Sequence, residues 1–304
     1  MYQIPSPFTI RTIRDYLKEF ESIFKSIGKR IPNAVLVANN PHFDITGALI
    51  FYKTIEYIIK KDCLFKPKLQ GHDSCIDQMN KFGFGGLLRP YFNQRAYNLF
   101  SLKYHEYDGV FVAPFVLKEE ECTQEEHRYA PNIEAFYSDP TITYSIFQCM
   151  AEIRSNFAEH AMDDTDTILV ASGNKQNFQI VCADTGVGIV SSLRPSLNAD
   201  RFIPSEDVLE MATQEGITSK KNTSHMGYGL WLVCQLVEAQ RGELHIYSEG
   251  YYFTSIGGKV KKGRCGYWKG TIIYIYLPLQ NLEGIKSVKE HLAQKYDDIK
   301  LSIV

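Results

Sequence analysis

Hydrophobic residues in the first part of the chain follow helix and strand periods in turn. Apolar positions between 10 and 27 recur at three- and four-residue steps, which predicts an amphipathic helix against a core. A short apolar strand, a polar break and a more apolar helix follow. The expected elements are helices at 10–27, 46–61 and 75–84 and strands at 34–38 and 107–116. We interpret the acidic run at 119–121 as a solvated turn.

The pattern changes at Asp139-Pro140, where a long helical stretch begins and runs to His160. Alternating strands and helices follow without a further Pro/Gly-rich linker. Strands are expected at 166–172, 177–183, 243–248 and 270–278, and a helix at 230–240. We therefore place a domain boundary near residue 130 and predict an α/β fold of the α+β sandwich type. Its parts are a small α/β domain at 1–130, a mixed sheet covered by helices at 131–282, and a C-terminal helix and tail at 283–304.

Composition narrows the classes of function. The chain has 304 residues, of which 44% are hydrophobic and 22% charged, with a formal net charge of -2. Two globular domains fit this length, and the charge gives no bulk attraction for nucleic acid or anionic membrane. No apolar run reaches the roughly 20 residues that span a bilayer, and the start lacks a signal peptide pattern. We expect a cytoplasmic protein that contacts neither nucleic acid nor membrane. Its seven cysteines form no CxxC pair, so we expect reduced thiols.

Candidate chemistry begins on the long helix. Glu152 and Asn156 are four residues apart and therefore share one helix face. An Asn oxygen is a hard neutral ligand for Mg²⁺ whose other positions hold phosphate oxygens and water. A neighbouring carboxylate can align and deprotonate an attacking water or hydroxyl. Taken alone, the same pair also fits a solvated helix face.

A second signal is NFQIVCADTGVGI, an apolar strand that leads directly into Asp184, Gly186 and Gly188. A carboxylate only accepts hydrogen bonds, so it suits the amino group of adenine, and glycines let backbone approach a nucleotide. An ordinary β-turn after a strand is the alternative for this motif.

The third signal is GITSKKNTSHMGYGLWL, in which Gly227 and Gly229 lie just before a helix. Backbone N–H groups and the positive end of a helix dipole favour phosphate there. Lys220 could reach terminal phosphate oxygens, and Thr218 could add a hydroxyl donor. For the lysine, solvation of a lid loop is an equal alternative.

The order of these elements resembles the superfamily of gyrase, heat-shock chaperone, histidine kinase and mismatch-repair ATPases over about 141–280. AEIRSNFAEHA resembles its N box, DTGVGI its G1 box and MGYGL its G2 box. The resemblance implies a Bergerat fold that binds ATP and Mg²⁺. It implies roles as follows: Glu152 as base, Asn156 as magnesium ligand, Asp184 as adenine contact, Gly186, Gly188, Gly227 and Gly229 as nucleotide loops, and Thr271 as support for the adenine contact.

The sequence also narrows the choice among the branches of this superfamily. Gyrase, chaperone and mismatch-repair relatives need a transmitting domain after the ATP site, and only about 25 residues follow Leu279 here. An autokinase needs a phosphoacceptor histidine on a dimerising helix, which neither His105 nor His127 provides. The chain is then most similar to regulatory kinases of the anti-sigma-factor type. Its FDITG turn and following helix resemble an anti-sigma-antagonist (STAS) domain, in which Thr46 before Gly47 stands at the phosphoacceptor position; an ordinary helix cap is the alternative.

We therefore predict a Mg-ATP-dependent regulatory ATPase or Ser/Thr protein kinase. The alternative is an ATP-gated interaction switch with little turnover, whose lid covers about 194–225. A regulatory protein partner is expected and a homodimer is possible; the partner's identity and the trigger stay open. The basic group Lys259, Lys261, Lys262 and Arg264 is interpreted as a solvated hairpin tip.

Overall fold

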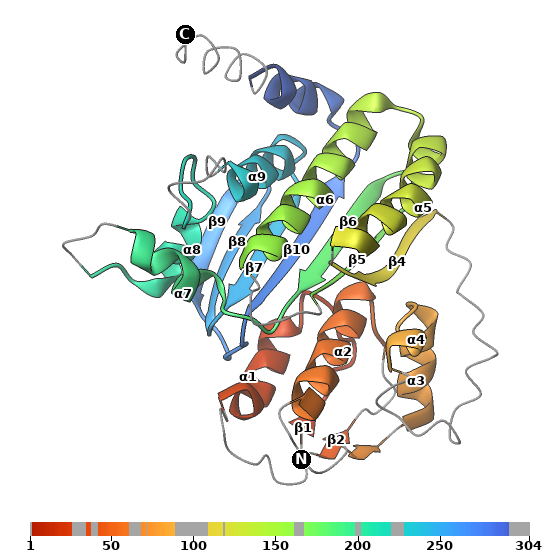
Figure 1. Ribbon diagram of the computed structural model, residues 1–304, viewed down its shortest axis with the longest axis vertical. Coiled ribbons are helices and arrows are strands. Elements are labelled where there is room, and N and C mark those ends of the chain that lie inside the picture. The colour runs from red at the N-terminus through yellow and green to blue at the C-terminus, as the bar shows by residue number, and fades with distance from the viewer. Residues whose placement is uncertain are drawn as a thin grey trace.

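A computed structural model describes residues 2–25, 35–37, 42–60, 68–70, 72–88, 109–117, 119–160, 167–197, 202–219 and 228–291 of the chain (Figure 1). The helices are α1 (Ile13–Lys25), α2 (Ile45–Lys60), α3 (His72–Lys81), α4 (Gly85–Leu88), α5 (Glu119–Tyr137), α6 (Pro140–His160), α7 (Ile189–Leu193), α8 (Ser205–Met211) and α9 (Gly229–Ala239), with a 3-10 turn at Arg194–Ser196. The strands are β1 (Tyr2–Gln3), β2 (Val35–Val37), β3 (Lys68–Gln70), β4 (Val110–Val116), β5 (Ile168–Gly173), β6 (Asn177–Ala183), β7 (Glu243–Ser248), β8 (Tyr251–Ile256), β9 (Lys259–Arg264) and β10 (Thr271–Pro278).

A seven-stranded sheet with the order β4-β5-β6-β10-β7-β8-β9 forms the centre of the molecule. Every neighbouring pair in it is antiparallel, so the prediction of a mixed sheet is wrong. The error has a topological cause. β6 and β7 are connected through helices and run parallel, as the sequence pattern suggests, but β10 inserts between them and pairs antiparallel with both. The α/β sandwich itself is confirmed.

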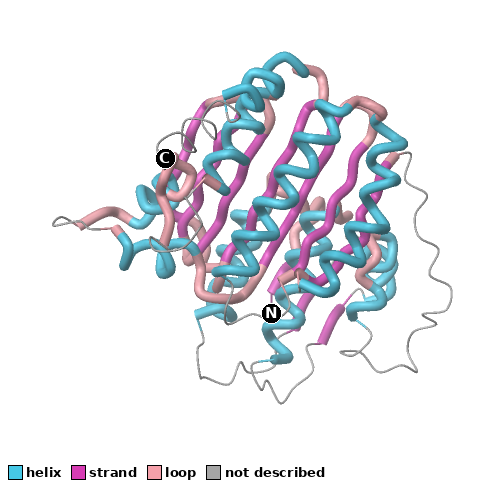
Figure 2. The backbone as a smooth tube through the Cα atoms, turned by 45° about the horizontal axis from the view of Figure 1, so that its top comes forward, coloured by secondary structure: helices cyan, strands magenta, loops and turns pink. Residues whose placement is uncertain are grey.

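Both faces of this sheet are covered by helices. Because side chains alternate along each strand, successive residues enter different cores. Ile180 and Cys182 of β6 point into a core shared with α5, α6 and α9. Val181 and Ala183 point the other way, into a core shared with α1 and α2. Figure 2 shows α5, α6 and α9 lying across one face of the strands, and Figure 1 shows α1 and α2 against one end of the sheet.

The sheet draws on residues from both sides of the boundary expected near residue 130. That position falls inside α5, which packs against β4. β4 in turn pairs with β5 and forms an edge of the sheet. The acidic run at 119–121 begins α5, so the expectation of a turn there is wrong; acidic residues are favoured in the first turn of a helix.

The basic residues expected at a hairpin tip lie instead in β9, the other edge strand. The tip is the turn at Gly257 and Gly258, whose φ values are 55° and 79°. Lys262 reaches back from β9 to α8, where its Nζ pairs with Asp207 Oδ1 at 2.5 Å and with Glu210. The basic edge strand therefore holds α8 against the sheet, which a charge count along the sequence does not reveal.

The N-terminal elements include a small parallel sheet with the order β1-β2-β3. α2 begins just after Asp44, whose Oδ1 accepts a hydrogen bond from the Gly47 amide at 2.9 Å. Thr46 is fully buried at this helix start. A hydroxyl in that position is covered from any phosphorylating enzyme, so the ordinary cap accounts for the FDITG turn in this structure. The resemblance of the region to a STAS domain stays a prediction.

α2 carries a buried ion pair behind the sheet. Lys53 and Glu56 are 0% and 1% exposed, and the Lys53 ammonium contacts the Glu56 carboxylate directly. Tyr52 donates to the same carboxylate at 3.3 Å, and Lys60, which is 41% exposed, pairs with it at 3.4 Å. Removing one member of a buried pair leaves the other charge desolvated without compensation.

We therefore expect Lys53→Met to lower the free energy of unfolding by about 3 kcal/mol. Lys60→Met removes an exposed partner of the same Glu56 and is the matched control, with an expected loss below about 1 kcal/mol. Urea denaturation followed by circular dichroism measures both. Equal losses in the two variants would contradict the assignment of Lys53 as the buried partner.

Asp44 gives the fold a pH dependence. Burial raises the pKa of its carboxyl to about 6, although bonds from Gly47 and Thr46 act to lower it. The folded chain thus binds this proton more tightly than the unfolded chain does. The contribution of Asp44 to stability is fully present below about pH 4 and is lost as the pH rises through about 6.

Asp44→Asn keeps a side chain that caps helices well but removes this titration. We expect the stability of the wild type relative to Asp44→Asn to fall by at most about 3 kcal/mol between pH 4 and pH 7. Urea denaturation of both chains across this range measures it. A difference that does not vary with pH would show that Asp44 titrates normally.

Candidate nucleotide site

The first part of the candidate site is the face of α6 that carries Glu152 and Asn156. The side-chain amide nitrogen of Gln148, which lies one helical turn before Glu152, donates a hydrogen bond to Glu152 Oε1 at 2.8 Å. The Asn156 amide nitrogen donates to the backbone oxygen of Glu152, also at 2.8 Å. Both side chains are half-buried. Because the Asn156 nitrogen is engaged by the helix, its oxygen is the atom presented for a ligand.

The start of α9 lies directly against this face. A Cβ atom built on Gly229 would be 2.9 Å from Asn156 Nδ2 and 3.1 Å from Glu152 Oε2. A larger residue here would displace the Asn156 and Glu152 side chains, so glycine lets them keep these positions. The structure therefore brings together three of the predicted residues, and it places the amino terminus of a helix beside the carboxylate and the amide.

The second part is the turn after β6. Asp184 is 2% exposed, and its two carboxylate oxygens accept backbone hydrogen bonds, from the Gly186 amide at 2.5 Å and from the Thr271 amide at 3.1 Å. A carboxylate is an acceptor only, so these backbone donors orient both of its oxygens. Thr271 therefore supports Asp184 through its backbone in this structure.

Strand register places these parts toward the same end of the sheet. Ala183, the last residue of β6, lies opposite Ile168, the first residue of the strand that follows α6. Ser248, the last residue of β7, lies opposite Thr271, the first residue of β10. α9 leads into β7 through a short turn and packs beside α6 (Figure 1). The carboxyl end of α6, the amino end of α9 and the Asp184 turn thus face the same region.

The G1 turn is held by residues that the sequence pattern did not single out. Gly188, with φ of 87°, precedes α7, and the next amide, that of Ile189, donates to Ser248 Oγ at 3.0 Å. Glu249 accepts a hydrogen bond from the Ser191 amide at 2.8 Å and contacts its hydroxyl. A carboxylate at a helix N-terminus is favourable. In the sequence, Ser248 and Glu249 are marked only by their position, in the tripeptide Ser-Glu-Gly at the end of a strand.

Of three further predicted site residues, Thr218 is described and two are not. Thr218 follows α8 in an irregular, half-buried segment. Lys220 and Gly227 fall outside the described residues. Their contribution to a phosphate lid stays a prediction.

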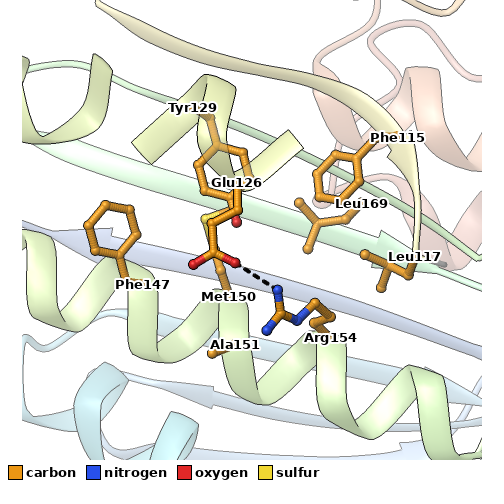
Figure 3. Close-up of a pocket in the computed structure, with 9 residues that line it drawn as sticks. All are labelled: Phe115, Leu117, Glu126, Tyr129, Phe147, Met150, Ala151, Arg154 and Leu169. Carbon is orange, nitrogen blue, oxygen red and sulfur yellow. Dashed lines mark hydrogen bonds and ion pairs between the residues drawn. The ribbon is translucent and has the colours of Figure 1, made fainter. Parts of the chain in front are cut away.

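A separate pocket lies on another side of α6 (Figure 3). It has a volume of about 30 Å³ and contains the Arg154–Glu126 ion pair at 2.8 Å. Arg154 is two positions from both Glu152 and Asn156, about 200° around the helix from either. This volume accommodates little more than water. The pocket is therefore distinct from the candidate nucleotide site and too small for a nucleotide. Its lining consists of Phe115, Leu117, Glu126, Tyr129, Phe147, Met150, Ala151, Arg154 and Leu169.

The side chains fit a metal that is held mainly by phosphate. Among the described residues, no group of three or more His, Cys, Asp or Glu side chains is arranged to hold an ion by itself. One amide oxygen from Asn156 would complete a coordination sphere of phosphate and water oxygens, which Mg²⁺ accepts. The cysteines in the described part of the chain are free thiols. The search for membrane-crossing helices, made over the same part, found no candidate.

Comparison with known families agrees with this geometry. A family model described as histidine kinase-, DNA gyrase B-, and HSP90-like ATPase matches residues 143–281. A search of curated proteins found no match for the chain. The matched range starts within α6 and ends after β10, so it includes both parts of the site. Residues 143–281 are therefore an ATPase domain of the histidine kinase, DNA gyrase B and HSP90 family, with the Bergerat fold.

Proposed function

We propose that the chain binds Mg-ATP between α6, the Asp184 turn and the start of α9, and that it acts as a regulatory ATPase or protein kinase. The observation that carries the proposal is the approach of Gly229 to Glu152 and Asn156. The buried carboxylate of Asp184 follows β6 at the same end of the sheet. In the proposed complex Asp184 accepts a hydrogen bond from the adenine amino group. The α9 amino terminus faces the phosphate chain.

Glu152 is the proposed base. Its carboxylate is anchored by Gln148, so it is oriented before any nucleotide arrives. It would accept the proton of a water or a protein hydroxyl as that oxygen bonds to the γ-phosphorus. The bond from this phosphorus to the bridging oxygen breaks, and ADP leaves with the electron pair. Mg²⁺, held by Asn156, would neutralise charge on the phosphate oxygens.

The finer assignment is a regulatory kinase of the anti-sigma-factor type that acts on a protein partner. Thr46 is a poor acceptor within the same chain because its side chain is fully buried. We therefore propose that the phosphoryl group is transferred to a hydroxyl of a separate protein or to water. We also propose that the chain acts as a homodimer.

An ATP-gated interaction switch is the second candidate, and the attachment of α8 favours it. α8 lies within the proposed lid and is held to β9 by Lys262, which contacts Asp207 and Glu210. Nucleotide that moves the lid would change these exposed contacts and the surface they form. Such a switch needs ATP binding but not the base.

Two substitutions on one helix face separate the candidates. We expect Glu152→Ala to keep Mg-ATP binding and to reduce turnover by 10²–10⁴-fold (about the range for a general base). We expect Asn156→Ala to lose most Mg²⁺-dependent binding. Calorimetry with Mg-ATP measures binding, and phosphate release with partner labelling measures turnover.

Arg154→Ala is the matched control, because Arg154 lies on the same helix about 200° away and its ion pair with Glu126 is partly exposed. The Arg154→Ala substitution is expected to change neither Mg-ATP binding nor turnover. Unaltered turnover in Glu152→Ala would contradict the catalytic proposal and favour the switch. Undiminished binding in Asn156→Ala would remove the metal assignment from both.

A further inference from the structure

Trp268 lies in the connection between β9 and β10 and is fully buried. Its indole Nε1–H donates a hydrogen bond to the backbone oxygen of Asp184 at 2.8 Å. Indole nitrogen is a donor only and usually finds a partner when buried. The partner here is the main chain of the residue that carries the proposed adenine contact, 84 positions away in the sequence.

The segment around Trp268 surrounds Asp184 on several sides. The Asp184 amide donates to the Thr271 carbonyl at 3.0 Å, while the Thr271 amide donates back to the Asp184 carboxylate. Gly270, with φ of 91°, passes so close to this carboxylate that a Cβ atom would collide with it. The Glu249 amide donates to the Trp268 carbonyl at 3.1 Å. The position of Asp184 is thus set by this segment as well as by β6.

The other side of Trp268 touches the N-terminal region. Its ring lies 4.5 Å, centroid to centroid, from that of Phe24 in α1. Gly266, two residues earlier, lies where a Cβ atom would collide with the α1 backbone at Leu17. Trp268 therefore fills the space between the first helix of the chain and the turn of the ATPase domain. No other described tryptophan has such a place: Trp231 packs beside Tyr228 and His291.

We propose that Trp268 is a positioning residue for purine recognition, and that it makes the selectivity of the site for adenine depend on the docking of α1. This inference rests on the proposed function. Its physical basis is that a hydrogen bond between a 6-amino group and the Asp184 carboxylate requires a fixed acceptor. The N–H edge of Trp268 and its ring contact with Phe24 both contribute to fixing it. The indole N–H holds the Asp184 main chain, and Phe24 holds the indole.

The test compares affinities for ATP and GTP, because the two purines differ at the group that Asp184 would read. Calorimetry with Mg²⁺ measures both nucleotides on the full chain. Trp268→Phe keeps an aromatic ring against Phe24 but removes the N–H donor. We expect its preference for ATP over GTP to fall about fivefold, the effect of one hydrogen bond. Trp231→Phe is the matched control and is expected to keep the wild-type preference.

Phe24→Leu tests the dependence on α1, since it removes the ring but keeps much of the apolar volume. We expect a loss of preference in the same direction and of smaller size. A folded Trp268→Phe chain with the wild-type preference overturns the positioning role. An unchanged preference in Phe24→Leu overturns the link to α1. A wild-type chain that binds no ATP overturns the proposed function instead.

If Trp268→Phe does not fold, tryptophan fluorescence of the Trp231→Phe chain tests the inference instead. The chain has two tryptophans, so Trp268 is the only one in Trp231→Phe. Its emission is expected to change when ATP saturates the site and to change less with GTP. Equal responses to the two nucleotides, or none to bound ATP, would overturn the inference.

Discussion

The site depends on a carboxylate that is buried at the end of a central strand. Asp184 is almost fully covered, and burying such a group is costly unless its oxygens are hydrogen-bonded. Backbone amides from its own turn and from β10 satisfy that requirement. The strand that supports Asp184 lies beside it, between β6 and β7, although it comes 87 residues later in the chain.

Coverage of both faces of the sheet gives the ATPase domain a neighbour within the same chain. α6, which carries the proposed metal and base residues, packs with α9 on one face, while α1 and α2 occupy the other. The two cores are separated by the thickness of the strands, so alternate residues of β6 belong to different cores. Displacement of α1 would expose apolar surface behind the Asp184 turn. The described N-terminal helices α1 and α2 therefore pack behind the strand that carries Asp184.

Local patterns predicted much of the domain, because the spacing of apolar residues in the sequence indicates strands β6 and β7 and helix α9 directly. Glu152, Asn156 and Asp184 were selected as candidates because their chemistry sits on recognisable elements, and their roles stay predictions. Pairing was harder to predict, because nothing in the period of β10 says that it lies between β6 and β7. Trp268, Ser248 and Glu249 were missed for a related reason: their partners are distant in sequence, and their residue types are ordinary for buried or turn positions.

A crystal structure with Mg²⁺ and a non-hydrolysable ATP analogue tests the account most directly. We expect the adenine amino group within hydrogen-bond distance of the Asp184 carboxylate, the metal on the Asn156 oxygen, and the phosphates at the start of α9. An analogue bound elsewhere, or one whose adenine has no contact with Asp184, would contradict it.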